Sequence, residues 1–154
     1  MKSTLKEMVR QIRGFTRQLL ATTNPDWLHF APEGTSNHML WHAGHALWVV
    51  DHLCVARLTG ESELPTGWAS KFGMDCDPVA EQTEWPELAV VLDLLTRQEA
   101  RMIELIENMQ PEQLVIRPDD RRDLVGGIIH GLHDEAKHHG EMYLLHKLCK
   151  AKTS

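Results

Sequence analysis

The sequence predicts an all-α protein, a four-helix bundle that forms one domain over residues 1–154. Three observations carry this prediction. Four segments place apolar residues three or four positions apart, no segment shows the period-two alternation of a strand, and the length suits one ordinary domain. Apolar residues make up 42% of the chain and charged residues 25%, which is the balance of a globular protein.

The first two predicted helices begin and end at residues that favour helix termini. The first covers Thr4–Thr22, and Thr4 with Glu7 has the pattern of a capping box. Its apolar stripe consists of Leu5, Met8, Val9, Ile12, Phe15 and Leu19. The second covers Ser36–Leu58, with Ser36 as the expected N-cap and Gly60 just past the end.

The third predicted helix opens at Pro86, a favoured first-turn residue, and ends near Met109. The fourth begins after Asp123 and continues to Lys150, and a short helical turn is expected at Pro111–Leu114. Residues 60–85 join the second helix to the third and show little periodicity. A connection of that length can cross a bundle, so these two helices are expected to run parallel.

Composition excludes several classes of function. A net charge of −6 argues against nucleic acid as a partner, because phosphate-binding surfaces are usually basic. No uninterrupted apolar run approaches 18 residues, and the amphipathic start of the chain does not fit a secretory signal. Three well-separated cysteines are expected to be reduced thiols. We therefore expect a cytoplasmic protein without a membrane partner.

Histidine is enriched, and its placement follows two of the predicted helices. All of the ten histidines except His29 fall in the second or the fourth helix. In the second helix the histidines lie within roughly 80° of one another around the helix axis, and they are His38, His42, His45 and His52. In the fourth helix one stripe, expected to face the core, consists of Gly127, His130, Asp134, His138, Glu141, Leu145 and Leu148.

Two facing histidine stripes favour a metal site. A single histidine on an apolar face is more often a packed core residue, and a bundle whose histidines simply pack stays an open alternative. Burial of Asp134 between His130 and His138 would cost several kcal/mol unless a positive charge lay beside the carboxylate. A divalent ion supplies that charge and accepts imidazole nitrogen and carboxylate oxygen at about 2.0–2.2 Å.

The pattern favours one ion with about three protein ligands. A ferritin-type di-iron site needs Glu-x-x-His on two helices, and the spacing occurs only at Glu135–His138. The metalloprotease pattern His-Glu-x-x-His is absent from the sequence, and scattered cysteines disfavour a structural zinc site. A mononuclear site with open positions for water or substrate remains, which is typical of a catalytic metal.

Two motifs resemble a known family. The segment from Trp41 to Trp48, with Asp51-His52-Leu53 after it, and the segment from His133 to Leu145 resemble the second and last helices of the DinB-like (YfiT-like) four-helix-bundle metalloenzymes. The resemblance implies a triad of ligands, usually three histidines, with one from the second helix and two from the last. On this chain the ligands map onto His45, Asp134 and His138.

Asp134 departs from the family pattern, since a histidine usually stands there. A set of two histidines and one carboxylate suits one divalent ion of Zn, Ni, Fe or Mn. His130 or His42 stays open as a replacement or supplement for a member of the triad.

The resemblance also implies a function: a metal-dependent transferase or hydrolase that acts on a small molecule with a low-molecular-weight thiol. Glu141 would bind a ligand or carry a proton, or would be a solvated or salt-bridged helix residue, and Trp41 and Trp48 would line the pocket or pack in the core. The alternative is a metal-binding or stress-responsive bundle without turnover. A homodimer is expected from helix packing in this class.

Overall fold

The computed structural model describes residues 1–76, 84–116 and 123–153, and among these it contains helices and no strand. Four helical stretches form the bundle: α1 (Lys2–Thr22), α2 (Met39–Val50), α5 (Leu88–Asn108) and α6 (Leu124–Thr153). The all-α prediction is confirmed. None of the helices described is long and apolar enough to cross a membrane.

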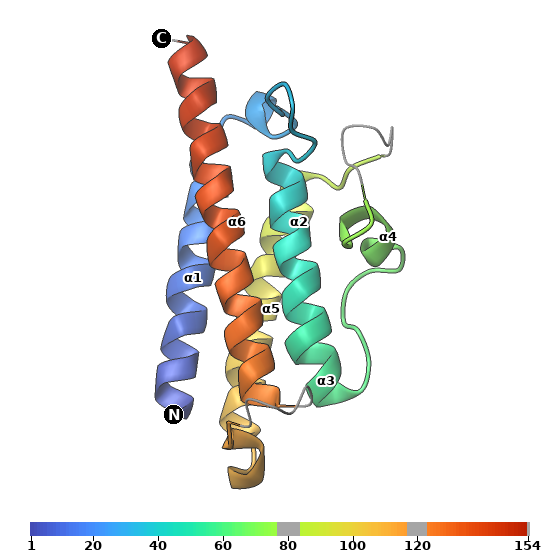
Figure 1. The fold of residues 1–154 in the computed structure, drawn as a ribbon, viewed down its shortest axis with the longest axis vertical. Helices are drawn as coiled ribbons and strands as arrows, with labels where there is room; N and C mark the ends of the chain where they lie inside the picture. The colour runs from blue at the N-terminus through green and yellow to red at the C-terminus, as the bar shows by residue number, and fades with distance from the viewer. Residues whose placement is uncertain (77–83, 117–122, 154) are drawn as a thin grey trace.

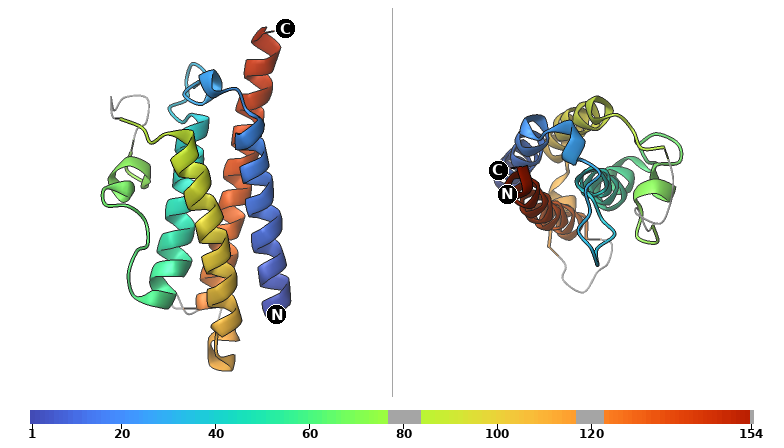
Figure 2. Two further views of the ribbon diagram at one scale, coloured as in Figure 1. Left: turned by 180° about the vertical axis from the view of Figure 1, so that it is seen from behind. Right: turned by 90° about the horizontal axis from the view of Figure 1, so that it is seen from above.

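The four helices run in an up-down-down-up order. Figure 1 shows α1 and α6 ascending, while α2 and α5 descend. The contacts pair α1 with α5 and with α6, and α2 with α5 and with α6, and the view from above in Figure 2 shows the four arranged around a common core. The parallel course predicted for the second and third long helices is confirmed.

The start of α1 differs from the prediction. The helix begins at Lys2 with Met1 as N-cap and no side-chain cap, because Leu5 N–H already donates to the Met1 carbonyl. The capping box at Thr4 is therefore wrong. The buried face also differs, since it consists of Leu5, Val9, Arg13, Thr16, Leu19 and Leu20. Phe15 lies to one side of this face and is 58% exposed.

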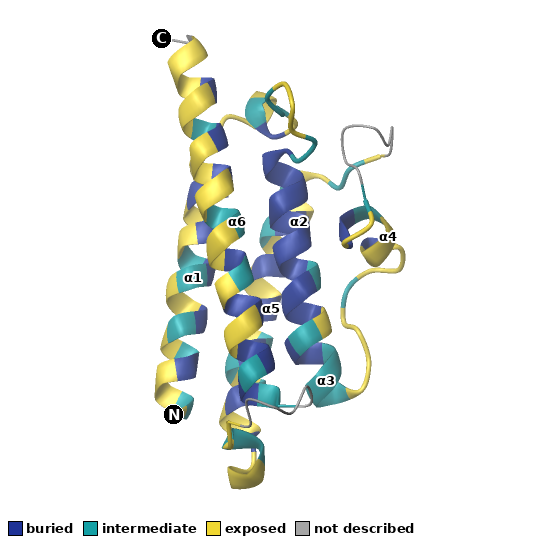
Figure 3. Cartoon of the chain, in the orientation of Figure 1, coloured by how far each residue is buried: buried dark blue, intermediate teal, exposed yellow. Residues whose placement is uncertain are grey.

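The second long helix begins three residues later than predicted and changes its winding. Its N-cap is His38, whose Nδ1 accepts a hydrogen bond of 3.1 Å from Trp41 N–H, so Ser36 as N-cap is wrong. After Val50 the chain forms a π-helical turn, η2 (Asp51–Val55), and then α3 (Ala56–Thr59). Gly60 ends the stretch at φ 95°, as predicted. Nearly every residue of α2 is buried (Figure 3).

The later boundaries lie close to those predicted. Helix α5 begins at Leu88, two residues after Pro86, and α6 begins at Leu124 but continues to Thr153 rather than Lys150. Two 3₁₀ turns, η1 (Pro25–Trp27) and η3 (Pro111–Leu114), flank the bundle. The second of them is the turn that the sequence predicted.

The crossover contains a short helix that its sequence did not predict, α4 (Trp68–Phe72). Trp68 Nε1 donates to the Gly44 carbonyl at 3.0 Å. A Cβ at Gly44 would lie 2.2 Å from the Phe72 ring, so only glycine allows this approach. The missing side chain at Gly44 therefore docks the crossover on α2. Residues 77–83 of the connection lie outside the described residues.

Candidate metal centre

Three side chains whose atoms could bind a metal ion meet between α2 and α6. Asp134 Oδ2 lies 3.3 Å from His138 Nε2 and 3.8 Å from His45 Nε2. The three donor atoms all lie within 4.8 Å of one another. Because α2 and α6 are neighbours, His45 meets Asp134 and His138, which lie 89 and more positions later in the chain. We call His45, Asp134 and His138 the inner group.

The ring of His45 is held in one orientation. Its Nδ1 lies 2.6 Å from the Phe72 carbonyl oxygen. A carbonyl oxygen only accepts, so Nδ1 carries the proton and Nε2 presents a lone pair toward Asp134. The ring also stacks on Trp41, with centroids 4.6 Å apart and an interplanar angle of 20°. A ligand histidine usually has its second nitrogen bound in this way.

The carboxylate of Asp134 needs a positive partner. Its Oδ2 is buried and has no hydrogen-bond partner of acceptable geometry among the described residues. An unpaired buried carboxylate oxygen is costly. Two imidazole nitrogens and this oxygen form a donor set that suits Zn, Ni, Fe(II) or Mn. The residues present therefore fit a divalent ion.

A second donor group, the outer group, shares His138 with the first. It consists of His42, His138 and Glu141. His42 Nδ1 lies 2.7 Å from His138 Nδ1 and 3.0 Å from Glu141 Oε2. His138 Nδ1 lies 3.6 Å from the same carboxylate oxygen. His138 thus presents Nε2 to the inner group and Nδ1 to the outer group.

Burial keeps these imidazoles uncharged at neutral pH. Burial, with the repulsion of His138 second, lowers the pKa of His42 to about 3. Burial, with the repulsion of His45 second, lowers the pKa of His138 to about 4, although Asp134 opposes the shift. Partial burial, with the charge of Asp134 second, raises the pKa of Glu141, although its side chain stays largely exposed. Neutral imidazole is the form that binds a metal.

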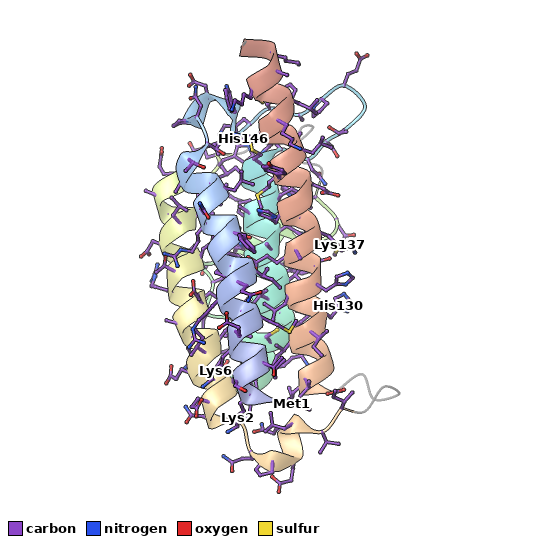
Figure 4. All side chains as sticks on the ribbon, turned by 90° about the vertical axis from the view of Figure 1, so that its left-hand side faces the viewer. Met1, Lys2, Lys6, His130, Lys137 and His146 are labelled. Carbon is purple, nitrogen blue, oxygen red and sulfur yellow. The ribbon has the colours of Figure 1, made fainter. Side chains whose placement is uncertain are left out.

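The other histidines stand apart from both groups. His130 is exposed and points away from the bundle (Figure 4), so it joins neither the core nor the triad. His52 is exposed and stacks on Trp48, which limits the buried stripe of α2 to His38, His42 and His45. His146 Nδ1 lies 3.0 Å from Thr23 Oγ1.

The predicted core line of α6 is displaced by one position. The almost fully buried side chains of α6 are Val125, Ile128, Leu132, Glu135 and Met142, and of the predicted line Gly127 and Leu145 are buried as well. Asp134 and His138 lie beside this line, face α2 and are half-buried. Glu141 and Leu148 are exposed. The stripe that carries Asp134 and His138 is therefore the edge of the buried face.

A cleft of about 460 Å³ opens beside the outer group. Its walls are residues of the loop before α2, together with His42, Glu141 and three leucines of α6, Leu144, Leu145 and Leu148. Trp41 does not line this cleft: it is buried against His45. Trp48 lines a separate cleft with His52 on the α4 side. The sequence did not predict the contact of the Phe72 carbonyl with His45. Its only trace in the sequence is Gly44, whose missing side chain lets Phe72 approach.

The protein's own thiols lie outside both donor groups. Cys54 and Cys149 are buried and Cys76 is half-buried. Burial raises the pKa of the Cys54 thiol to about 12, which leaves it a poor nucleophile.

An up-down-down-up bundle with a histidine and carboxylate cluster between its second and last long helices defines a class of helical protein with a candidate metal centre. The sequence matches the DinB superfamily over residues 8–142, and the chain belongs to this family. Comparison with curated proteins gives no match.

Proposed function

We propose that this DinB-superfamily protein binds one divalent metal ion through His45, Asp134 and His138, and uses it in a transfer or hydrolysis reaction on a small molecule. The buried Oδ2 of Asp134, which lacks a hydrogen-bond partner among the described residues, is the observation that carries the proposal. Both neighbouring imidazoles present Nε2 to that oxygen.

The chemistry of the group supports a thiol as co-substrate. When bound, a divalent ion stabilises a thiolate at neutral pH and lets it act as a nucleophile. The chain's cysteines lie outside both donor groups, so a reacting thiol would come from a small molecule. Glu141, whose pKa burial raises, lies at the cleft and can accept or return a proton there.

The cleft favours a catalytic metal ion over a structural one. A structural ion is fully ligated by protein, whereas a catalytic ion keeps positions open for substrate. The inner group contributes three ligands, and a cleft of about 460 Å³ lies beside the neighbouring outer group. A metal-binding bundle without turnover remains the second candidate, and an ion that exchanges no ligand would favour it.

Elemental mass spectrometry on untagged, chelator-free protein tests the proposal. We expect near one tight equivalent of metal in the wild type, which His45→Ala and His138→Ala each abolish. His146→Ala is the matched control, since its ring bonds Thr23 instead, and it should retain the metal. Full retention of the metal by His45→Ala and His138→Ala would contradict the ligand assignment. Thiol-transfer and hydrolysis reactions can then be screened with the ion found.

A further inference from the structure

The geometry points to a second divalent-ion position, formed by His42, Glu141 and Nδ1 of His138, on the cleft side of the inner group. This inference rests on the proposed function in one respect, because His138 would ligate the inner ion through Nε2 at the same time. It goes beyond that function, which requires a single ion.

The three donor atoms have the spacing that an ion imposes on its ligands. Their separations are 2.7, 3.0 and 3.6 Å. Ligands about 2.1 Å from a tetrahedral zinc ion stand about 3.4 Å from one another. Small adjustments of side-chain torsions therefore bring all three into one coordination sphere.

No single hydrogen bond can satisfy all three atoms, His42 Nδ1, His138 Nδ1 and Glu141 Oε2. If His42 Nδ1 donates to Glu141, His138 Nδ1 must accept; if His138 donates, His42 Nδ1 faces the carboxylate with a lone pair. With His42 as donor, the lone pairs of His138 Nδ1 and Glu141 Oε2 stay 3.6 Å apart, and with His138 as donor, those of His42 Nδ1 and Glu141 Oε2 stay 3.0 Å apart. A cation in the middle accepts from all three at once.

The position is accessible and can complete its ligand sphere with water. Glu141 has a side chain that is 58% exposed, and both it and His42 line the cleft of about 460 Å³. His42 is buried against α6, and this packing fixes its ring. The site therefore combines a rigid ligand, His42, with an adjustable one, Glu141. Such a site should exchange its ion faster than the inner group does.

Shared use of His138 requires one proton to leave. With Nε2 bound to the inner ion, the neutral ring carries its proton on Nδ1. Binding of an outer ion at Nδ1 would require that N–H bond to break, and the proton would pass to the buffer. The two ions would then lie roughly 6 Å apart, since each stands about 2 Å from its own nitrogen of one small ring.

Equilibrium dialysis of chelator-stripped protein against rising free Zn²⁺ tests the inference. We expect the wild type to bind two equivalents, the second at least tenfold more weakly than the first. Glu141→Gln and His42→Asn should each lose the second equivalent and keep the first. Because Glu141 is exposed, its variant reports on the site without disturbing the fold. His133→Ala, exposed on the same helix, should keep both.

The outcomes separate this inference from the proposed function. Saturation of the wild type at one equivalent that His45→Ala removes would overturn the second position and leave the first. A second equivalent that persists in the His42→Asn/Glu141→Gln double variant would also overturn it. One equivalent that survives His45→Ala but not Glu141→Gln would uphold the outer position and overturn the inner one. Anomalous scattering from zinc-soaked crystals should show two peaks roughly 6 Å apart.

Discussion

Nδ1 of His45 lies 2.6 Å from the backbone carbonyl oxygen of Phe72. A residue of the crossover thus orients a side chain of α2 toward α6. The contact exists because α4 packs directly on the backbone of Gly44, one residue before His45. Docking of the crossover and orientation of the His45 ring therefore depend on the same packing contact.

A side chain at Gly44 should separate these elements. Gly44→Ala places a methyl group 2.2 Å from the Phe72 ring, which must move and take its carbonyl away from His45. We expect zinc affinity to fall about 10- to 100-fold, as for the loss of other groups that orient a ligand. Unfolding free energy should fall by about 1–3 kcal/mol. Competition with a chromophoric chelator and urea unfolding measure the two effects.

Gly14→Ala is the matched control, because Gly14 is also helical and has nothing within 4 Å of an added Cβ. It should leave zinc affinity unchanged and stabilise the protein by about 0.5–1 kcal/mol. Equal zinc affinity in the two variants would contradict the role of the Phe72 carbonyl.

Asp134 should act through its charge. Asp134→Asn keeps the shape of the side chain but removes the negative oxygen, and we expect metal affinity to drop at least tenfold. Asp134→His restores the histidine usual in the family and should retain one equivalent. Metal content after dialysis at fixed free Zn²⁺ distinguishes these outcomes. Asp93→Asn, on an exposed part of α5, should behave as wild type. Undiminished binding by Asp134→Asn would exclude the carboxylate from the ligand set.

His38 should make the metal-free protein sensitive to acid. Burial, with His29 second, lowers the pKa of His38 to about 4. In the unfolded chain this histidine has its ordinary pKa of about 6.5. Between pH 4 and pH 6.5 the unfolded chain therefore binds more protons than the folded protein. Stability present above pH 6.5 is therefore lost as the pH falls toward 4. Protonation of Nδ1 would also end the hydrogen bond that caps α2.

His38→Asn should keep the cap but remove this titration. Between pH 7 and 5, the wild type should lose about 2 kcal/mol more unfolding free energy than the variant. Urea unfolding of both proteins at the two pH values measures the difference. Parallel losses in the two proteins would show that His38 does not titrate in this range.

The buried ion pair of Arg13 and Glu135 should stabilise the bundle only as a pair. Arg13 Nη2 lies 2.9 Å from Glu135 Oε2, and both side chains are almost inaccessible. Arg13→Met should cost about 3–5 kcal/mol, because it leaves a buried carboxylate without a countercharge. Arg13→Met/Glu135→Leu should recover most of that loss.

Urea unfolding of the single and double variants measures the coupling. Arg17→Met removes a partly exposed pair with Glu99, which joins α1 to α5, and should cost less than about 1 kcal/mol. A double variant as unstable as the sum of its single variants would show that the two side chains are independent.

The sequence by itself determined the helices and the class of residue at the centre. Apolar periodicity located four long helices, and Gly60 and Pro111 marked a helix end and a 3₁₀ turn. Motifs on two helices pointed to His45, Asp134 and His138, and the fold brings them together. These features are local, because they depend on the spacing of residues within one helix.

Only the tertiary structure decided which face of each helix is buried and what completes the centre. Arg13 lies in the core while Phe15 is exposed, because α1 is rotated to meet Glu135 of α6. His42 joins Glu141, His130 faces away, and the Phe72 carbonyl reaches His45 from a segment without periodicity. Helical spacing fixes angles around one axis only. The rotation of one helix against another depends on packing between residues distant in the chain.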